Sequence, residues 1–414
     1  ETLGTAGFFM KHRIDPPRVL VSSAAHYSWA KGMKVLGFGT DQLVTVAIDD
    51  HMRLDVDDLR RHLDRFEEEQ VPVLAVVGML GTTEFGTVDP IHDIVAEREI
   101  RRSRGFDFGI HVDGAWGGYL ASVFRTPDGE WRDQSEMKVG YTYFPGEVVH
   151  GAFTSLPKAD SITVDPHKLG YVPYPAGAFV ARNREVVDFI VQDATYVFDT
   201  AAEDHVDTGD KLHNLGQYIL EGSKPGASAA AVWVTHNVLP LHSEGLGRLL
   251  RLTIRACEIF WDSVRDHAKD WEGRVRIRTP FEPDSNLICI ALNPEGNTSI
   301  AEMNRFTRAI FRKMRVEPDQ PVQVKEFIAS YTSMTKENLP GSQGDRILED
   351  LGLDPGTFVS VPSDPRTEAD HLYILRHTLM NPWQLAGPDD VSYIERYWQY
   401  LGSVIEEELA ARES

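Results

Sequence analysis

Short apolar runs alternate with helical patterns through the first half of the chain. Helical spacing covers residues 57–70 and 91–101, and the runs that favour strands cover residues 18–23, 71–80, 109–112, 161–164 and 176–181. Strands that alternate with helices predict an α/β fold with an open, mainly parallel sheet and helices on both faces. Ligands of such sheets bind beyond the carboxyl ends of the strands. Four residues lie just beyond predicted strands: His26, Thr83, Asp113 and Lys168.

The pattern changes at about residue 247. Helices are predicted at residues 249–267, 299–314 and 390–411, and strands at residues 274–278, 287–292, 322–331 and 371–375. Residues 336–354 are rich in Gly and Asp, which predicts a surface excursion. We therefore expect a large domain over residues 1–246 and a smaller α+β domain over residues 247–414.

A lysine stands at the end of one predicted buried strand, in the sequence Asp165-Pro-His-Lys168. Burial disfavours an ammonium group, and the neutral amine is the form that attacks a carbonyl carbon. The alternative is a surface lysine that ends a strand, which the flanking Asp-Pro-His and the apolar run disfavour. The pattern therefore predicts that Lys168 forms a Schiff base with pyridoxal phosphate.

Further candidates lie near the ends of the other strands. A carboxylate such as Asp113 beside the pyridine nitrogen would make the cofactor an electron sink, although an Asp here could also cap a helix. His26 could stack its ring on the pyridine, or it is a core histidine. Thr83 and Ala115 could border the cofactor ring, or they are a turn residue and a core residue respectively.

Two candidates flank the lysine, and two lie downstream. Asp165 and His167 either orient the cofactor or pair with each other. Residues 221–226, which include Ser223, offer a hydroxyl, a cation and close backbone approach to a phosphate, or they are a polar helix start. Tyr196 precedes an acidic, aperiodic stretch. A tyrosine on a closing loop could protonate a carbanion, or it packs against the domain.

Composition excludes several classes of function. The chain of 414 residues has a net charge of −21, which argues against nucleic acid or an anionic membrane as a partner. No apolar run is long enough to span a bilayer. Cys257 and Cys289 have apolar neighbours, so we expect core residues in a cytoplasmic protein. No metal site is predicted, because His-Glu-x-x-His is absent and His111-x-Asp113 lacks a third ligand.

Together these residues resemble the group II pyridoxal-phosphate decarboxylases, with the strongest likeness to the bacterial tyrosine decarboxylases. The likeness runs from about Val19 almost to the C-terminus. It rests on His26-Tyr-Ser-Trp29, Ser161 to Lys168, Gly170 to Tyr174, Ala194-Thr-Tyr-Val-Phe198 and Leu220 to Trp233. The resemblance implies the fold type I (aspartate aminotransferase-like) architecture and pyridoxal 5′-phosphate as cofactor. It also implies an amino acid substrate and a homodimer with its active sites at the interface.

The resemblance also implies roles for individual residues. Lys168 would hold the cofactor through a Schiff base, and Ser223 would reach the phosphate of the neighbouring subunit's cofactor. Tyr196 would protonate the product carbanion, and the substrate would lie near Tyr174 and Thr378. Catalytic roles are implied for Lys168, Tyr196, His26 and His167. Cofactor contacts are implied for Lys168, Asp113, His26, Thr83, Ala115, Asp165, His167 and Ser223.

The chain departs from the family pattern in three places. Nothing matches the Gly-rich phosphate loop that family members carry upstream of the region of Arg18, so we expect roughly the last two-thirds of a family member. Asp113-Gly-Ala-Trp116 stands in place of Asp-Ala-Ala-Tyr, and Arg376-His-Thr378 in place of Arg-Ala-Ser.

The expected activity is α-decarboxylation of an L-amino acid, with tyrosine as the first candidate. Three alternatives stay open: a decarboxylase of glutamate or another amino acid, a Cα–Cβ lyase like sphingosine phosphate lyase, and a catalytically incomplete fragment.

Overall fold

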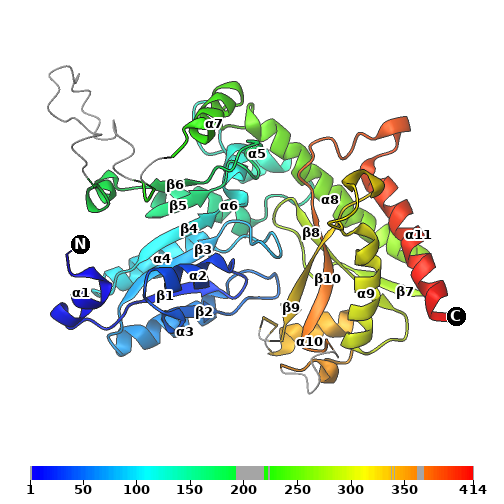
Figure 1. The fold of residues 1–414 in the computed structure, drawn as a ribbon, viewed down its shortest axis with the longest axis horizontal. Coiled ribbons are helices and arrows are strands. Elements are labelled where there is room, and N and C mark those ends of the chain that lie inside the picture. The colour runs from blue at the N-terminus through cyan, green and yellow to red at the C-terminus, as the bar shows by residue number, and fades with distance from the viewer. Residues whose placement is uncertain are drawn as a thin grey trace.

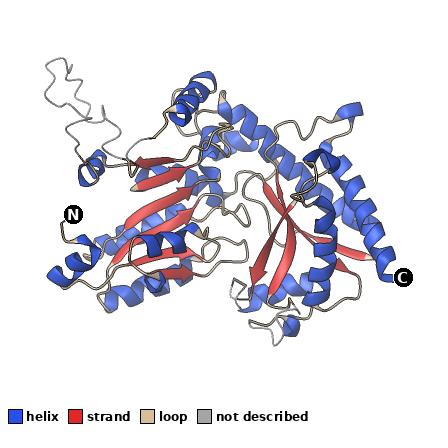
Figure 2. Ribbon diagram, in the orientation of Figure 1, coloured by secondary structure: helices blue, strands red, loops and turns tan. Residues whose placement is uncertain are grey.

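The structure is a computed structural model that describes residues 2–192, 219–221, 224–336, 338–339, 341–360 and 368–413. The described residues form two sheets with helices around them (Figures 1 and 2). The larger sheet contains β1 (Arg18–Ser22), β2 (Leu43–Val46), β3 (Val73–Met79), β4 (Gly109–Gly114), β5 (Ser161–Val164) and β6 (Ala178–Ala181). Its order is β2-β1-β3-β4-β5-β6, and only the edge strand β6 runs antiparallel to its neighbour. The predicted open, mainly parallel sheet is therefore confirmed, although β2 was not predicted.

Helices cover both faces of the larger sheet, as predicted. Leu20 and Val76 face a core that α3, α4 and α6 complete, whereas Val19 and Val77 face the opposite side, with Met33 of α2. This alternation follows from the two-residue period of a strand. The helices up to the second sheet are α1 (Gly4–His12), α2 (Ser28–Val35), α3 (Val56–Glu68), α4 (Ile91–Arg102), α5 (Gln134–Lys138), α6 (Glu147–Thr154), α7 (Ala227–Val238) and α8 (Leu246–Asp270).

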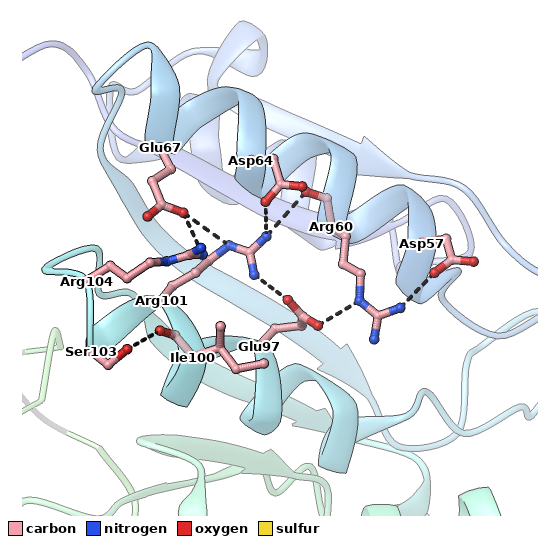
Figure 3. Close-up of polar contacts among 9 residues, drawn as sticks. All are labelled: Asp57, Arg60, Asp64, Glu67, Glu97, Ile100, Arg101, Ser103 and Arg104. Atoms are coloured by element: carbon pink, nitrogen blue, oxygen red, sulfur yellow. Dashed lines mark hydrogen bonds and ion pairs between the residues drawn. The ribbon is translucent and has the colours of Figure 1, made fainter.

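A network of charged side chains joins α3 to α4 (Figure 3). Arg101 of α4 is only 3% exposed and pairs with Glu97 on its own helix and with Asp64 and Glu67 on α3. Glu97 also accepts a hydrogen bond of 2.7 Å from Arg60 Nε. These ion pairs join the two helices that pack beneath β1 and β3.

The smaller sheet contains β7 (Val275–Arg278), β8 (Leu287–Pro294), β9 (Ser330–Thr335) and β10 (His371–Thr378), in the antiparallel order β7-β8-β10-β9. One face packs against α8, α9 (Ile300–Met314) and α11 (Tyr393–Glu413). The other face turns toward the larger sheet, where Cys289 and Leu372 share a core with Ile48 and Phe85. Cys257 and Cys289 are buried and free, as predicted.

Two predictions in this region are wrong. Residues 322–331 do not form one strand, because β9 begins only at Ser330, where pairing with β10 becomes available. Residues 336–354 are not a plain surface excursion either. They contain α10 (Gly341–Asp350), and Ile347, Leu348 and Leu351 are buried against the smaller sheet. None of the described helices is long and apolar enough to cross a membrane.

Candidate active site

Six of the predicted site residues lie where β3, β4 and β5 end, at the edge of the larger sheet that meets the smaller one: Thr83, Asp113, Ala115, Asp165, His167 and Lys168. Thr83 follows β3, Asp113 closes β4 and Lys168 follows β5. Because these strands are parallel and adjacent, their carboxyl ends lie side by side. The smaller sheet reaches the same edge, since Tyr171 Oη donates a hydrogen bond of 2.7 Å to the Met380 carbonyl.

Lys168 is held by a tight turn that its own motif forms. The Lys168 amide donates to the Asp165 carbonyl at 3.0 Å, and Lys168 Nζ lies 2.9 Å from Asp165 Oδ2. The side chain of Lys168 is 33% exposed. All four residues of β5 are only partly buried, so the prediction that the lysine ends a buried strand is wrong. β5 is only partly covered because it lies next to the exposed edge strand β6.

His167 supports this turn from its exposed side. Its Nδ1 donates to the carbonyl of Ala176, which has no proton to give, and its Nε2 lies 3.9 Å from Asp165 Oδ2. The ring orientation of His167 is therefore set by the backbone at the entry to β6. The pairing of Asp165 with Lys168 is closer than its pairing with His167.

Asp113 is 9% exposed, and three donors fix its carboxylate. Trp29 Nε1 donates to Oδ2 at 3.1 Å, and the Ala115 amide and the Thr163 hydroxyl donate to Oδ1 at 3.2 Å and 3.5 Å. The helical turn that follows begins at Gly117 and has Trp116 as its N-cap, so Asp113 does not cap it. Trp29 is a residue that the site analysis missed, although it stands in the stretch from His26 that carried the resemblance.

His26 lies beyond β1, in the turn that leads into α2. It is partly exposed, so the core-histidine alternative is wrong. Its Nδ1 lies 2.8 Å from Ser28 Oγ, and the Trp29 amide donates to its carbonyl at 3.1 Å. Within the described residues, His26 forms no hydrogen bond with Asp113 or Lys168. The structure thus connects His26 to Asp113 through Trp29.

Thr83 and Ala115 lie on the turns after β3 and β4. Thr82, rather than Thr83, holds the first turn, since its buried hydroxyl lies 2.9 Å from the hydroxyl of Thr87. Thr83 is partly exposed, and its hydroxyl makes no hydrogen bond to any described residue. Ala115 is also partly exposed. Both residues can therefore meet a ligand.

The substrate candidates occupy different surroundings. Thr378 ends β10 and lines a cavity of about 240 Å³ together with Arg376 and Ser330. Tyr174 is 50% exposed and lies six residues after Lys168. Tyr196 and Ser223 lie outside the described residues.

Arg376 is a candidate that the sequence analysis named only within a motif. Its Nη1 donates to Ser330 Oγ at 3.2 Å, and its buried Nε has no hydrogen-bond partner. Among the described residues it forms no ion pair, and burial lowers the pKa of its guanidinium. An unpaired arginine that lines a cavity is suited to bind a carboxylate. The sequence could have indicated Arg376 by its position two residues before Thr378, a predicted substrate residue.

This set of side chains fits pyridoxal phosphate. An amine, a carboxylate held by three donors, a hydroxyl without a hydrogen-bond partner among the described residues, and a small residue lie at three adjacent strand ends: Lys168, Asp113, Thr83 and Ala115. The amine can bind an aldehyde, and the carboxylate can hold a protonated ring nitrogen. A side chain larger than Ala115 would occupy space that a flat ring needs.

Two family models match most of the chain. The pyridoxal-dependent decarboxylase conserved domain matches residues 7–135, and the tyrosine decarboxylase C-terminal model matches residues 256–409. The chain belongs to the pyridoxal-dependent decarboxylase family. Its similarity to the L-tyrosine decarboxylase of Enterococcus faecalis is 32% identity over 96% of this chain and 63% of that relative. With the L-tyrosine decarboxylase of Levilactobacillus brevis it shares 34% identity over 88% of this chain and 57% of that relative.

The chain thus spans less than two thirds of the length of these two relatives. Among solved structures, it superimposes on Oryza sativa TDC with PLP and tryptamine with a TM-score of 0.64 at 12% identity, over 96% of this chain and 66% of that one. At this identity the likeness concerns the fold alone. The fold type I architecture expected from the sequence is confirmed.

Proposed function

We propose that the protein decarboxylates an L-amino acid with pyridoxal 5′-phosphate and that tyrosine is its substrate. The observation that carries this proposal is the placement of Lys168 and Asp113 at adjacent strand ends, in a chain that matches the C-terminal model of the tyrosine decarboxylases. Bound pyridoxal phosphate would supply an electron sink for the bond pair that departing carbon dioxide leaves at Cα. The residues around it then have distinct tasks.

Lys168 would hold the cofactor through its aldehyde group. Its ammonium must first lose a proton, and Asp165 Oδ2 at 2.9 Å is the near acceptor. Asp113 would hold the protonated ring nitrogen of the cofactor, and Trp29 and the Ala115 amide orient its carboxylate. His26, Thr83 and Ala115 border the ring, and Asp165 and His167 support the lysine end.

Arg376 binds a carboxylate of the substrate in the cavity that Thr378 lines. Its guanidinium has donors to spare, since Ser330 accepts from only one of its nitrogens. We propose that Tyr174 and Thr378 border the substrate side chain, that Tyr196 donates the proton that Cα receives, and that Ser223 binds the phosphate of the neighbouring subunit's cofactor. These assignments rest on the match of each residue to the family motifs.

We also propose a homodimer with active sites at the interface, a cytoplasmic location, and a domain boundary between residues 246 and 247. In support of an interface, Trp233, Val234 and Val238 on α7 are largely exposed apolar side chains. The boundary agrees with the start of α8 at Leu246. Molar mass in solution, measured by light scattering, tests the dimer.

The experiment uses the full-length protein with added pyridoxal phosphate and a panel of amino acids. We expect tyrosine to yield tyramine and carbon dioxide in equal amounts. A preference for glutamate would contradict the proposal that tyrosine is the substrate. An aldehyde product without carbon dioxide would identify a Cα–Cβ lyase instead of a decarboxylase. Lys168→Ala should abolish the absorbance of bound cofactor, whereas Lys158→Ala, a change just before the same strand, should keep it.

A further inference from the structure

A fully buried asparagine joins two segments of the site. Asn286 lies just before β8, and its side chain is 0% exposed. It connects Trp116, which follows Ala115, with Leu379, which follows Thr378. The two connected residues are 263 positions apart in the chain (379 − 116). We call Trp116, Asn286 and Leu379 the Asn286 brace.

Every polar group of the Asn286 amide has a partner. Trp116 Nε1 donates to Oδ1 at 3.2 Å, and Nδ2 donates to the Leu379 carbonyl at 3.2 Å and to Thr253 Oγ1 at 3.3 Å. The Leu379 amide in turn donates to the Asn286 carbonyl at 2.8 Å. A buried amide with all its hydrogen bonds made holds its neighbours in one arrangement, because each broken bond would leave a desolvated polar group.

The indole of Trp116 extends the brace to the turn after β3. A Cβ built on Gly81 would lie 2.8 Å from Trp116 Cδ1, so the ring packs directly on this glycine. Gly81 has a φ of +93° and stands two residues before Thr83. The brace therefore fixes three segments relative to one another: the turn with Thr83, the end of β4 with Asp113, and the end of β10 with Thr378.

Both outer members of the brace adjoin the two segments in which the chain departs from the tyrosine decarboxylase pattern. Trp116 closes Asp113-Gly-Ala-Trp116, and Leu379 directly follows Arg376-His-Thr378. The brace thus connects the last residue of the first departure with the residue that directly follows the second.

We propose that Asn286 is a positioning residue that determines substrate specificity. It sets the distance between Thr378 and the strand ends that carry Asp113 and Thr83, and this distance decides which amino acid side chain fits. The inference rests on the proposed function, because it concerns discrimination among amino acids at the same site. A site built to fit a polar side chain loses discrimination when its parts separate.

The test compares kcat/KM for tyrosine and for phenylalanine in the full-length enzyme. Trp116→Phe keeps an aromatic ring and removes the donor to Asn286. We expect the ratio of kcat/KM for tyrosine to kcat/KM for phenylalanine to change about tenfold, the effect of one lost buried hydrogen bond. Thr253→Val removes the acceptor on α8 and should shift the ratio in the same direction by less. A purely structural role would lower both activities together and leave the ratio unchanged.

Trp261→Phe is the matched control, because Trp261 Nε1 donates to Thr279 Oγ1 at the same 3.2 Å and neither residue belongs to the brace. Cofactor absorbance and melting temperature identify any variant that fails to fold, and Thr253→Val still decides the question if Trp116→Phe is lost. If this ratio stayed unchanged in the folded variants, the inference about Asn286 would be overturned, and the proposed function would not be affected. A wild-type enzyme that decarboxylates neither amino acid would overturn the proposed function, and the inference with it.

Discussion

Lys168 and Asp165 form an ion pair across three residues of the turn that follows β5, with 2.9 Å between Nζ and Oδ2. An amine must be neutral to attack a carbonyl carbon, so this pair has to separate or exchange a proton when cofactor binds. The geometry makes Asp165 both the partner of the lysine and the acceptor of its proton.

Asp165→Asn should slow cofactor loading by about a hundredfold, the lower range for loss of a general base. The measurement is the rate at which bound-cofactor absorbance rises after apoprotein is mixed with pyridoxal phosphate. Asp266→Asn is the control, because Asp266 pairs with Lys269 at the same spacing and the same 2.9 Å on the surface of α8. Equal loading rates in both variants would argue against a role for Asp165.

Tyr171→Phe should weaken substrate binding. Burial raises the pKa of Tyr171 to about 12, so its hydroxyl stays protonated and donates to the Met380 carbonyl. The bond ties the turn of Lys168 to the segment after Thr378, and its loss costs about 1 kcal/mol. We expect KM for tyrosine to rise about fivefold, in proportion to that cost. In Tyr143→Phe, which loses a 2.7 Å bond to Asp262 elsewhere, KM should not change.

Arg101→Met should destabilise the fold by about 3 kcal/mol, because it leaves buried Glu97 with a single cationic partner. Arg60→Met removes the other partner of Glu97 (Figure 3), but Arg60 is 46% exposed and solvent screens its charge. We expect that change to cost less than about 1 kcal/mol. Urea unfolding of both variants measures the difference, and equal losses would contradict it. The KM for tyrosine should stay the same in both variants.

Much of the larger sheet could be predicted from the sequence because its strands are apolar runs with clear ends. β5 was predicted with its observed bounds, Ser161–Val164, and β3 lies within its predicted range. β2 was missed because Leu43-Val-Thr-Val46 is only four residues long and half-exposed. α10 was missed because Gly and Asp obscure the helical spacing of Ile347 and Leu351, which pack on the smaller sheet.

The site could be predicted only where its residues stand next to a strand end. Lys168 and Asp113 satisfy that condition, and the parallel sheet brings them together. Trp29 lies within α2, and Asn286 precedes the start of β8 rather than following the end of a strand. They contact Asp113 and Trp116, which are 84 and 170 positions away along the chain. Such contacts depend on tertiary packing, and hydrophobic periodicity carries no information about them. The roles proposed for Tyr196 and Ser223 stay predictions.

His377 should make the free energy of unfolding decrease at acid pH. The ring is partly buried between Phe260 and Tyr397, with Nε2 beside the Tyr397 hydroxyl, and the loss of solvent around it lowers its pKa to about 4. The ordinary value of 6.5 applies in the unfolded chain, so the unfolded state binds more protons between pH 6.5 and 4. The free energy of unfolding therefore falls as the pH falls through this window, by up to about 3 kcal/mol.

His377→Leu removes the titrating group, so its free energy of unfolding should depend less on pH between 6.5 and 4. The new side chain also lacks the bond to Tyr397, which lowers stability at every pH and leaves the slope as the informative quantity. Urea unfolding at several pH values measures that slope. His51→Leu, a change at a histidine that is 46% exposed, should keep the wild-type slope. If His377→Leu kept it too, burial of His377 would not be the source of the acid sensitivity.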